Sequence, residues 1–484
     1  MIDRLSPADS SFLYLEDAST ATHVGQVLIF AAPDNFRPAR VREGIAARLS
    51  SHPRYRQKIR TLPGRIMTPV WIDDADFDLD YHVRRSALPA PGSIEQLQDF
   101  VARVASRPLD RSRPLWEVYV VEGVSEDRFA VVTKIHQALI DAGDVTGLSA
   151  DPAARTAESG SWTPVPAPST KELLGNAISG FVRRPTTVVD GIRGGVQELK
   201  ATAGQVAKVG GTIARAAVAP PSQRAFAVEG HNARRYLMTD LDLADLREIR
   251  DSASAPDGTR PTVHAIALTV IAGALRGWLQ ARGEHISSAR SVRALVPVSV
   301  ADDSTPYGSR VQAVFVELPV GEASPMMRLA QIQFSLEHQL RQHAGVRAAD
   351  LAAMAGFAPP ALHSLGVRLG ASMSTRLFNL VITNVPGPQR PMYADGVRLQ
   401  ASYPVIPLTR GHALAIGMTG YNARLHIGVL ADRDAVPDLE ILDGTLADAL
   451  AELLEAATSL PLSRGRVGAA VVVGGVCVGG AGCC

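Results

Sequence analysis

The sequence predicts an α/β protein of two domains joined by a connector. At 484 residues the chain is long enough for two domains, each with a buried core. Alternating helical and strand-like runs fill residues 1–150, and a second α/β region covers 236–460. Between them the composition changes around 151–170 to Pro, Ser, Thr and Ala, which is typical of a linker. We therefore divide the rest of the chain into a connector, 151–235, and a Gly/Val/Cys-rich tail, 461–484.

Charge and cysteine content exclude several classes of protein. The chain carries 49 basic and 48 acidic side chains, so no bulk electrostatic field favours nucleic acid as a partner. All three cysteines, Cys477, Cys483 and Cys484, lie in the tail, which suits a reducing cytoplasm. The first residues lack the apolar core of a signal peptide, and no internal apolar run reaches the roughly 20 residues that span a membrane. We therefore expect a cytoplasmic protein that reaches any lipid substrate from outside the bilayer.

The first domain is expected to begin with an apolar strand and a helix, over Gln26–Phe30 and Val41–Leu49. Two further strand-like runs, Leu115–Val121 and Arg128–His136, are separated by the short polar break Ser125–Asp127. Apolar runs separated by a few turn residues are typical of a β-hairpin.

The second domain is expected to alternate helices with strands. A buried helix is predicted over Val263–Leu279, and another over Pro325–His343, where Ser324 is placed to cap the helix. A strand over Phe378–Val385 leads into the sharp turn Pro386–Pro388. The other expected elements are strands at Arg293–Val300, Val311–Leu318, Leu414–Met418 and Leu425–Leu430, and a helix at about 437–457.

The end of the strand Arg128–His136 carries residues suited to proton transfer. His136 and Asp141 form a His-x-x-x-x-Asp pattern, and such groups at a strand end can take a proton from a hydroxyl in a water-poor site. Gln137 stands beside His136, and a carboxamide can orient a hydroxyl but cannot accept its proton at neutral pH. Neighbours on a strand point to opposite faces, so His136 points away from Gln137 if the strand continues through the pair.

Two segments resemble the bacterial wax ester synthase/diacylglycerol acyltransferase family: Arg113–Glu117 and Lys134–Ala142. That family carries His-His-x-x-x-Asp-Gly at this place, and its second His is the general base that activates the acceptor alcohol against an acyl-CoA thioester. In this chain the base position is Gln137 and the motif Gly is Ala142. The resemblance gives the first His and Asp141 mainly structural roles in fixing the turn.

A second family signature, Asn384–Pro388, is intact. A Pro-Gly pair at a strand end makes a tight turn, which an Asn side chain can tie. The resemblance implies that Asn384, Pro386 and Gly387 belong to the substrate channel between the two halves. Other segments that match the family are Arg4–Tyr14, Arg293–Val300, Tyr403–Leu408 and Val429–Arg433.

The chain also departs from the family at polar positions. The family's Asn-Asp pair at the head of the long helix of the second domain is His264-Ala265 here, and the Asn of its Gly-Asn-Arg is Ser309. The helix after the motif is interrupted early, since Asp144–Leu148 runs almost directly into Asp151-Pro152. These changes indicate relaxed pressure on the chemistry with the fold retained.

The resemblance implies two chloramphenicol-acetyltransferase-like domains, each a mixed sheet flanked by helices, with a helical connector. It implies an acyl-CoA-dependent O-acyltransferase of triacylglycerol or wax ester synthesis, which transfers a long-chain acyl group to diacylglycerol or a fatty alcohol. Acyl-CoA is then a co-substrate, and no cofactor or metal is implied. The alternative is an impaired paralogue that binds acyl-CoA or lipid, or pairs with an active homologue, because the base is Gln137.

Several roles stay open at this level. His136 is either a substitute base or a hydrogen-bonded structural residue. His264 is either a further candidate base, if the two halves bring it near, or a residue with a helix-capping or core role. The connector segment 171–217 has a weak helical period with basic residues such as Arg183, Arg184 and Arg193. It either packs on the body or is an interfacial element at the inner membrane face or lipid bodies. The tail is expected to be disordered, with acylation of Cys483 or Cys484 as the alternative.

Overall fold

The structure is a computed structural model that describes most of the two expected domains. The described residues are 3–16, 20–32, 37–49, 52–61, 68–142, 162–169, 172, 224–228, 231–253, 260–301, 309–341, 346–347, 377–385, 387–388, 390–394 and 396–459. The expectations for segment 144–148, for connector residues 173–217, for Pro386 and for the tail lie outside these residues. The side chains of Asp141, Ala142 and Ser309 lie outside them as well.

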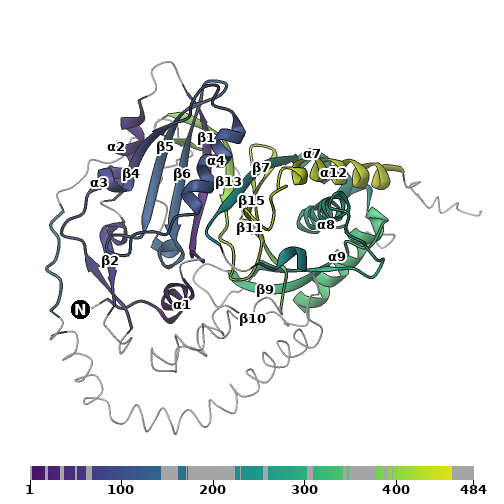
Figure 1. The fold of residues 1–484 in the computed structure, drawn as a ribbon, viewed down its shortest axis with the longest axis horizontal. Coiled ribbons are helices and arrows are strands. Elements are labelled where there is room, and N and C mark those ends of the chain that lie inside the picture. The colour runs from purple at the N-terminus through teal and green to yellow at the C-terminus, as the bar shows by residue number, and fades with distance from the viewer. Residues whose placement is uncertain are drawn as a thin grey trace, which may run out of the picture.

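Two mixed sheets form the body of the molecule (Figure 1). The first has the strand order β12-β13-β1-β6-β5-β4, and the second has the order β10-β9-β8-β11-β14-β15-β7. The strands of the first sheet are β1 (His23–Ala31), β4 (Val83–Ala87), β5 (Trp116–Val124), β6 (Arg128–His136), β12 (Tyr393–Ala394) and β13 (Val397–Val405). Those of the second are β7 (Arg234–Asp242), β8 (Val292–Ala301), β9 (Ser309–Leu318), β10 (Val346–Arg347), β11 (Leu380–Val385), β14 (Leu414–Tyr421) and β15 (Arg424–Asp432). A separate pair joins β2 (Gln57–Arg60) to β3 (Val70–Asp73).

Helices flank both sheets, as the resemblance implies. Beside the first sheet lie α1 (Pro7–Leu15), α2 (Pro38–Arg48), α3 (Leu79–His82) and α4 (Ile94–Ala105), with the short turns η1 (Pro53–Arg56) and η3 (Gln137–Ala142). Beside the second lie η4 (Arg224–Phe226), α7 (Leu243–Ser252), α8 (Val263–Ala281), α9 (Pro325–Arg341) and α12 (Ile441–Ser459). In Figure 1 the first sheet is at the left, and α8, α9 and α12 cover the side of the second sheet that is turned away from the first sheet. The mixed-sheet prediction is confirmed, because β4 runs parallel to β5 and β11 runs parallel to β8 and β14 while the other pairs are antiparallel.

The predicted hairpin is confirmed as β5 and β6. Its strands pair antiparallel, from Trp116 opposite Ile135 to Val121 opposite Ala130. The polar break turns the chain, because Glu126 and Asp127 adopt positive φ angles of 63° and 50°. The strand ends at His136, whose N–H donates to the Leu115 carbonyl, and Gln137 begins the turn that carries the motif.

The sequence division was wrong about one strand. β13 lies within 236–460 but pairs antiparallel with β1 in the first sheet, with Val27 opposite Tyr403 and Gly25 opposite Val405. The physical reason is a shared apolar cluster in which Val27 of β1, Val101 of α4, Met238 of β7 and Tyr403 of β13 pack together. The second half of the chain therefore completes the sheet of the first half.

The β13 strand also contacts the second sheet closely at Pro404. Its carbonyl oxygen accepts a hydrogen bond of 2.8 Å from the buried Tyr236 hydroxyl. A Cβ added at Gly428 would lie 2.0 Å from that same carbonyl oxygen, and one added at Gly417 would lie 2.7 Å from the Pro404 ring. Glycine at 417 and 428 therefore lets β13 approach β14 and β15 closely enough to join the two halves.

The helix α8 is the one helix in the described part of the chain that is long and apolar enough to cross a membrane. Most of it is already covered, since 72% of the apolar window is buried inside the protein. Trp278, Leu275 and Ile271 belong to the core cluster of the second sheet. The buried core helix predicted over Val263–Leu279 is thus confirmed.

We predict that Gly428→Ala destabilises the protein by about 1–3 kcal/mol, the usual cost of overpacking a tight contact, because the methyl group would push β13 away from β15. Gly420→Ala is the matched control, since an added Cβ there meets nothing within 4 Å. Denaturant unfolding of both variants measures the effect. Equal unfolding free energies for the two variants would contradict the proposed role of this contact.

Candidate active site

The motif begins where β6 ends, and His136 is fixed there on all sides. Its side chain is fully buried. The Nδ1 atom accepts a hydrogen bond of 3.1 Å from the backbone N–H of Ala138. The Nε2 atom lies 2.9 Å from the Thr22 hydroxyl, which itself donates to the Phe12 carbonyl. Because the Thr22 proton is already donated, the Nε2–H of His136 is the donor to Thr22, and this sets the tautomer.

These contacts keep His136 neutral and occupied. Burial lowers its pKa to about 4, although the Glu16 carboxylate 3.9 Å away partly opposes this shift. Arg111 also holds Glu16 in place, because its Nε donates a hydrogen bond of 3.0 Å to the Glu16 carboxylate. Neither ring nitrogen of His136 is free to accept a proton from a substrate. The geometry therefore favours the structural reading of His136 over that of a substitute base.

Gln137 occupies the position of the family's base, and its surroundings differ from those of His136. Its backbone N–H donates to the Thr22 carbonyl at 3.0 Å, which begins the turn η3. Its side chain is half-buried, and the structure gives its carboxamide no hydrogen-bond partner among the described residues. A carboxamide in this place can orient a hydroxyl but cannot remove its proton.

The Arg113–Glu117 segment supports the motif from the neighbouring strand. Trp116 is fully buried, stacks on His82 at 4.6 Å between ring centroids and donates from Nε1 to the Tyr55 carbonyl at 2.7 Å. Glu117 accepts a 2.7 Å hydrogen bond from the Tyr119 hydroxyl. These contacts give the Arg113–Glu117 segment a structural role, because they fix the position of β5 beside β6.

Buried charges that sequence reasoning missed lie on the α4 side of the same hairpin. Lys134 is 2% exposed, and its ammonium donates to the Arg107 carbonyl and lies 3.9 Å from Glu117. Burial lowers the pKa of Lys134 to about 8, with Glu117 opposing the shift. His23 Nε2 lies 3.1 Å from the Ala105 carbonyl, so His23 and Lys134 bind backbone carbonyls at the end of α4. Only the cross-strand pairing of Glu117 with Lys134 could have indicated this cluster in advance.

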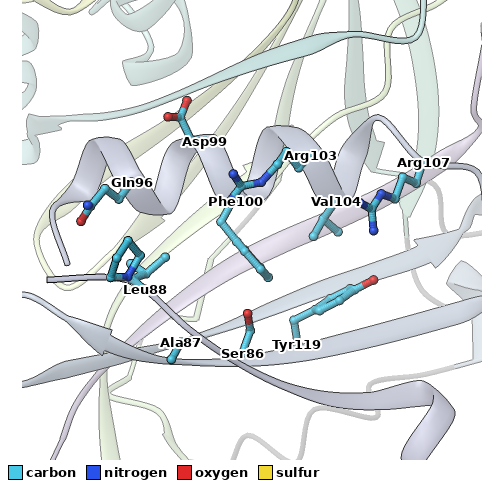
Figure 2. Close-up of a pocket in the computed structure, with 11 residues that line it drawn as sticks. Ser86, Ala87, Leu88, Gln96, Asp99, Phe100, Arg103, Val104, Arg107 and Tyr119 are labelled. Atoms are coloured by element: carbon cyan, nitrogen blue, oxygen red, sulfur yellow. The ribbon is translucent and has the colours of Figure 1, made fainter.

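A cavity of about 280 Å³ lies between α4 and the strands β4 and β5. Figure 2 shows Phe100 pointing from α4 into this space, with Tyr119 opposite, Arg103 on the helix and Arg107 just after its end. Phe100 and Tyr119 meet edge to face at 5.7 Å between ring centroids. No residue of either family motif lines this cavity, so we do not place the chemistry there.

One group in the described part of the chain could offer three metal ligands. Atoms of His231, Asp432 and Asp434 lie within 4.8 Å of one another. However, the Arg234 guanidinium lies 3.5 Å from the Asp432 carboxylate, and the backbone N–H groups of Asp434 and Ala435 donate to its other oxygen. A guanidinium here repels a cation, so we assign no ion to this group.

The second motif closes the end of β11 against β14. The Thr419 hydroxyl donates to the Val385 carbonyl at 3.2 Å. A Cβ added at Gly387 would lie 1.8 Å from the Gly420 carbonyl oxygen, so only glycine permits this close approach. Close packing against β14 therefore explains why the motif has glycine at position 387.

Asn384, the first residue of this motif, reaches the head of α8. Its side-chain Nδ2 lies 3.3 Å from Nδ1 of His264. Thr262 caps the helix by accepting a 3.0 Å hydrogen bond from the N–H of Ala265, and His264 is the second helical residue. The structure therefore joins two positions that are far apart in the sequence: the intact turn and one of the departures from the family.

The fold, together with the motif after β6 and the motif at the end of β11, defines a two-domain acyltransferase. A wax ester synthase/diacylglycerol acyltransferase from Marinobacter aquaeolei VT8 superposes with a TM-score of 0.63 at 25% identity, covering 94% of this chain and 99% of that one. The first condensation domain of the CDA synthetase shares the fold, with a TM-score of 0.53 at 14% identity and coverage of 95% and 97%.

The chain belongs to the wax ester synthase/diacylglycerol acyltransferase family. The family model described as the wax ester synthase/diacylglycerol acyltransferase catalytic domain matches residues 5–259, and the WS/DGAT C-terminal domain matches 307–454. A probable diacylglycerol O-acyltransferase of Mycobacterium tuberculosis H37Rv, tgs2, is 32% identical over 94% of this chain and 99% of its own length. Another from that strain, tgs1, is 30% identical over 98% and 100%. The family resemblance drawn from the motifs is confirmed.

We predict that His136→Gln reduces the pH dependence of stability. The unfolded chain binds a proton at His136 below about pH 6.5, whereas the folded protein excludes it until about pH 4. The free energy of unfolding of the parent therefore falls as the pH drops through this window, and His136 accounts for roughly 3 kcal/mol of that fall. Above pH 6.5 the residue contributes no pH dependence. Glutamine does not titrate, so the slope should decrease by nearly one proton.

Urea unfolding between pH 7.5 and 5 measures this slope, with exposed His285→Gln as the control. The lost hydrogen bonds lower the stability of His136→Gln at every pH, but only the slope tests the prediction. Parallel curves for the parent and His136→Gln would contradict a buried, neutral His136.

Proposed function

We propose that the protein is an acyl-CoA-dependent O-acyltransferase that transfers a long-chain acyl group to the hydroxyl of diacylglycerol or a fatty alcohol. The observation that supports this most strongly is the match to the family across both halves of the chain, which covers both family models and nearly the full length of the relatives. The intact Asn384–Pro388 segment and the scaffold around Trp116 agree with it.

The proposed reaction places three demands on the protein. The acceptor hydroxyl must be held beside the thioester carbonyl, its proton must be accepted, and the oxyanion must meet hydrogen-bond donors. Gln137 can meet the first demand but not the second. Loss of a positioned base typically costs about a hundred- to ten-thousand-fold in rate, so transfer should be slower than in relatives that keep the histidine.

The decisive experiment incubates the purified protein with radiolabelled palmitoyl-CoA and a panel of acceptors. We expect labelled triacylglycerol or wax ester to form in proportion to protein and time, with free CoA released in equal amount. Heat-denatured protein is the control for spontaneous acylation. Saturable acyl-CoA binding with no product from any acceptor would overturn the enzyme proposal and leave the non-catalytic paralogue.

We also propose that the protein is cytoplasmic and contacts anionic lipid surfaces peripherally through its connector, whose basic residues lie among regularly spaced apolar ones. Neutralising Arg183, Arg184 and Arg193 together to Gln should weaken flotation with vesicles that contain phosphatidylserine, because each basic residue near such a surface contributes about 1 kcal/mol. Arg103→Gln with Arg247→Gln, both exposed in the folded body, is the control. Unchanged flotation of the connector variant would assign the connector to packing.

A further inference from the structure

The proposed function lacks a proton acceptor at the family's position, so the other histidines are the natural candidates. Four of them are unsuitable, because His23, His82, His412 and His426 are each at most 4% exposed. Three of these bind backbone carbonyls through a ring nitrogen. His264 differs from these four, because it is half-buried at the head of α8 and its ring contacts a side chain of a family motif.

We propose that His264, oriented by Asn384, accepts the proton of the acceptor hydroxyl in this protein. The inference rests on the proposed function and names the residue that replaces the missing base. Two observations carry it. The Asn384 side-chain Nδ2 lies 3.3 Å from Nδ1 of His264, and the opposite ring nitrogen, Nε2, is buried without a hydrogen-bond partner among the described residues. A buried polar atom without a partner costs free energy, so a ligand that supplies the partner is favoured there.

The amide of Asn384 decides which ring nitrogen of His264 carries the proton. With Nδ2 facing the ring, the amide donates to Nδ1 and the proton of the neutral imidazole is on Nε2. Rotation of the amide by about 180° presents the carbonyl oxygen instead, which accepts from Nδ1–H and leaves Nε2 as the acceptor. The second arrangement is the active one, because a base oriented through its other nitrogen is aimed at the substrate.

The surroundings keep His264 in the form that can accept a proton. Burial lowers the pKa of His264 below its ordinary value. Its place as the second residue of a helix acts in the same direction, because the positive end of the helix dipole disfavours an imidazolium. At neutral pH the ring is therefore unprotonated and ready to act as a base.

The proposed step balances as follows. The acceptor oxygen forms a bond to the thioester carbonyl carbon while its proton passes to Nε2 of His264. Collapse of the tetrahedral intermediate breaks the carbon–sulfur bond, and the proton on Nε2 goes to the leaving CoA sulfur. The products are the ester and free CoA, and His264 returns to its starting state.

Substitution at three positions tests the proposal. His264→Ala, and the amide variant His264→Asn, should each lower kcat/KM for acyl transfer at least about 100-fold and remove the acidic limb of its pH profile. The Kd for palmitoyl-CoA should stay within threefold and the unfolding midpoint should be nearly unchanged. Asn384→Ala should lower kcat with little effect on that Kd, because it only orients the ring. Exposed His285→Ala is the control and should match the parent.

A rescue arm separates chemistry from structure. Adding Gln137→His and Ala142→Gly to His264→Ala should restore transfer by at least about tenfold, because it returns a titratable nitrogen to the family's position. Transfer by His264→Ala and His264→Asn within threefold of the parent would overturn this inference alone. Loss of palmitoyl-CoA binding together with activity in both variants would also overturn it, in favour of a structural role. A parent that binds palmitoyl-CoA but transfers nothing to any acceptor would overturn the proposed function itself.

Discussion

The antiparallel pairing of β13 with β1 links the two halves of the chain within one sheet. β13 belongs to the second half of the chain, yet it completes the sheet of the first half, while Pro404 is locked against β7 by the Tyr236 hydroxyl. The two halves are therefore not independent bodies that dock by their surfaces. The apolar cluster that α4 shares with both sheets includes Tyr403 and Val405 of this strand.

The pairing of β13 with β1 explains how the fold persists while the motif changes. His136 is needed for structure, since its hydrogen bonds join the turn after β6 to Thr22 before β1. The side chain of Gln137 makes none of the described hydrogen bonds, so a change at this position leaves those contacts intact. The Asn384 turn is held by the close approach of Gly387 to Gly420, so it persists for reasons of packing as well as chemistry.

Much of the fold could be predicted from the sequence, because it is encoded locally. The β5–β6 hairpin follows from two apolar runs and a polar break, and α8 from its long apolar pattern. The crossover of β13 could not be predicted, because the apolar pattern of a strand does not show which other strand it pairs with. The same limit applies to the site: the contact of His264 with Asn384 and the burial of His136 by Thr22 are long-range outcomes of packing.

We infer that this chain keeps the acyl-CoA site of its family although the motif base is lost. Calorimetric titration with a non-hydrolysable thioether analogue of palmitoyl-CoA tests it most directly, because binding does not depend on any proton acceptor. We predict one saturable site per chain, with much weaker binding of CoA alone. Absence of saturable binding up to the solubility limit of the analogue would contradict it.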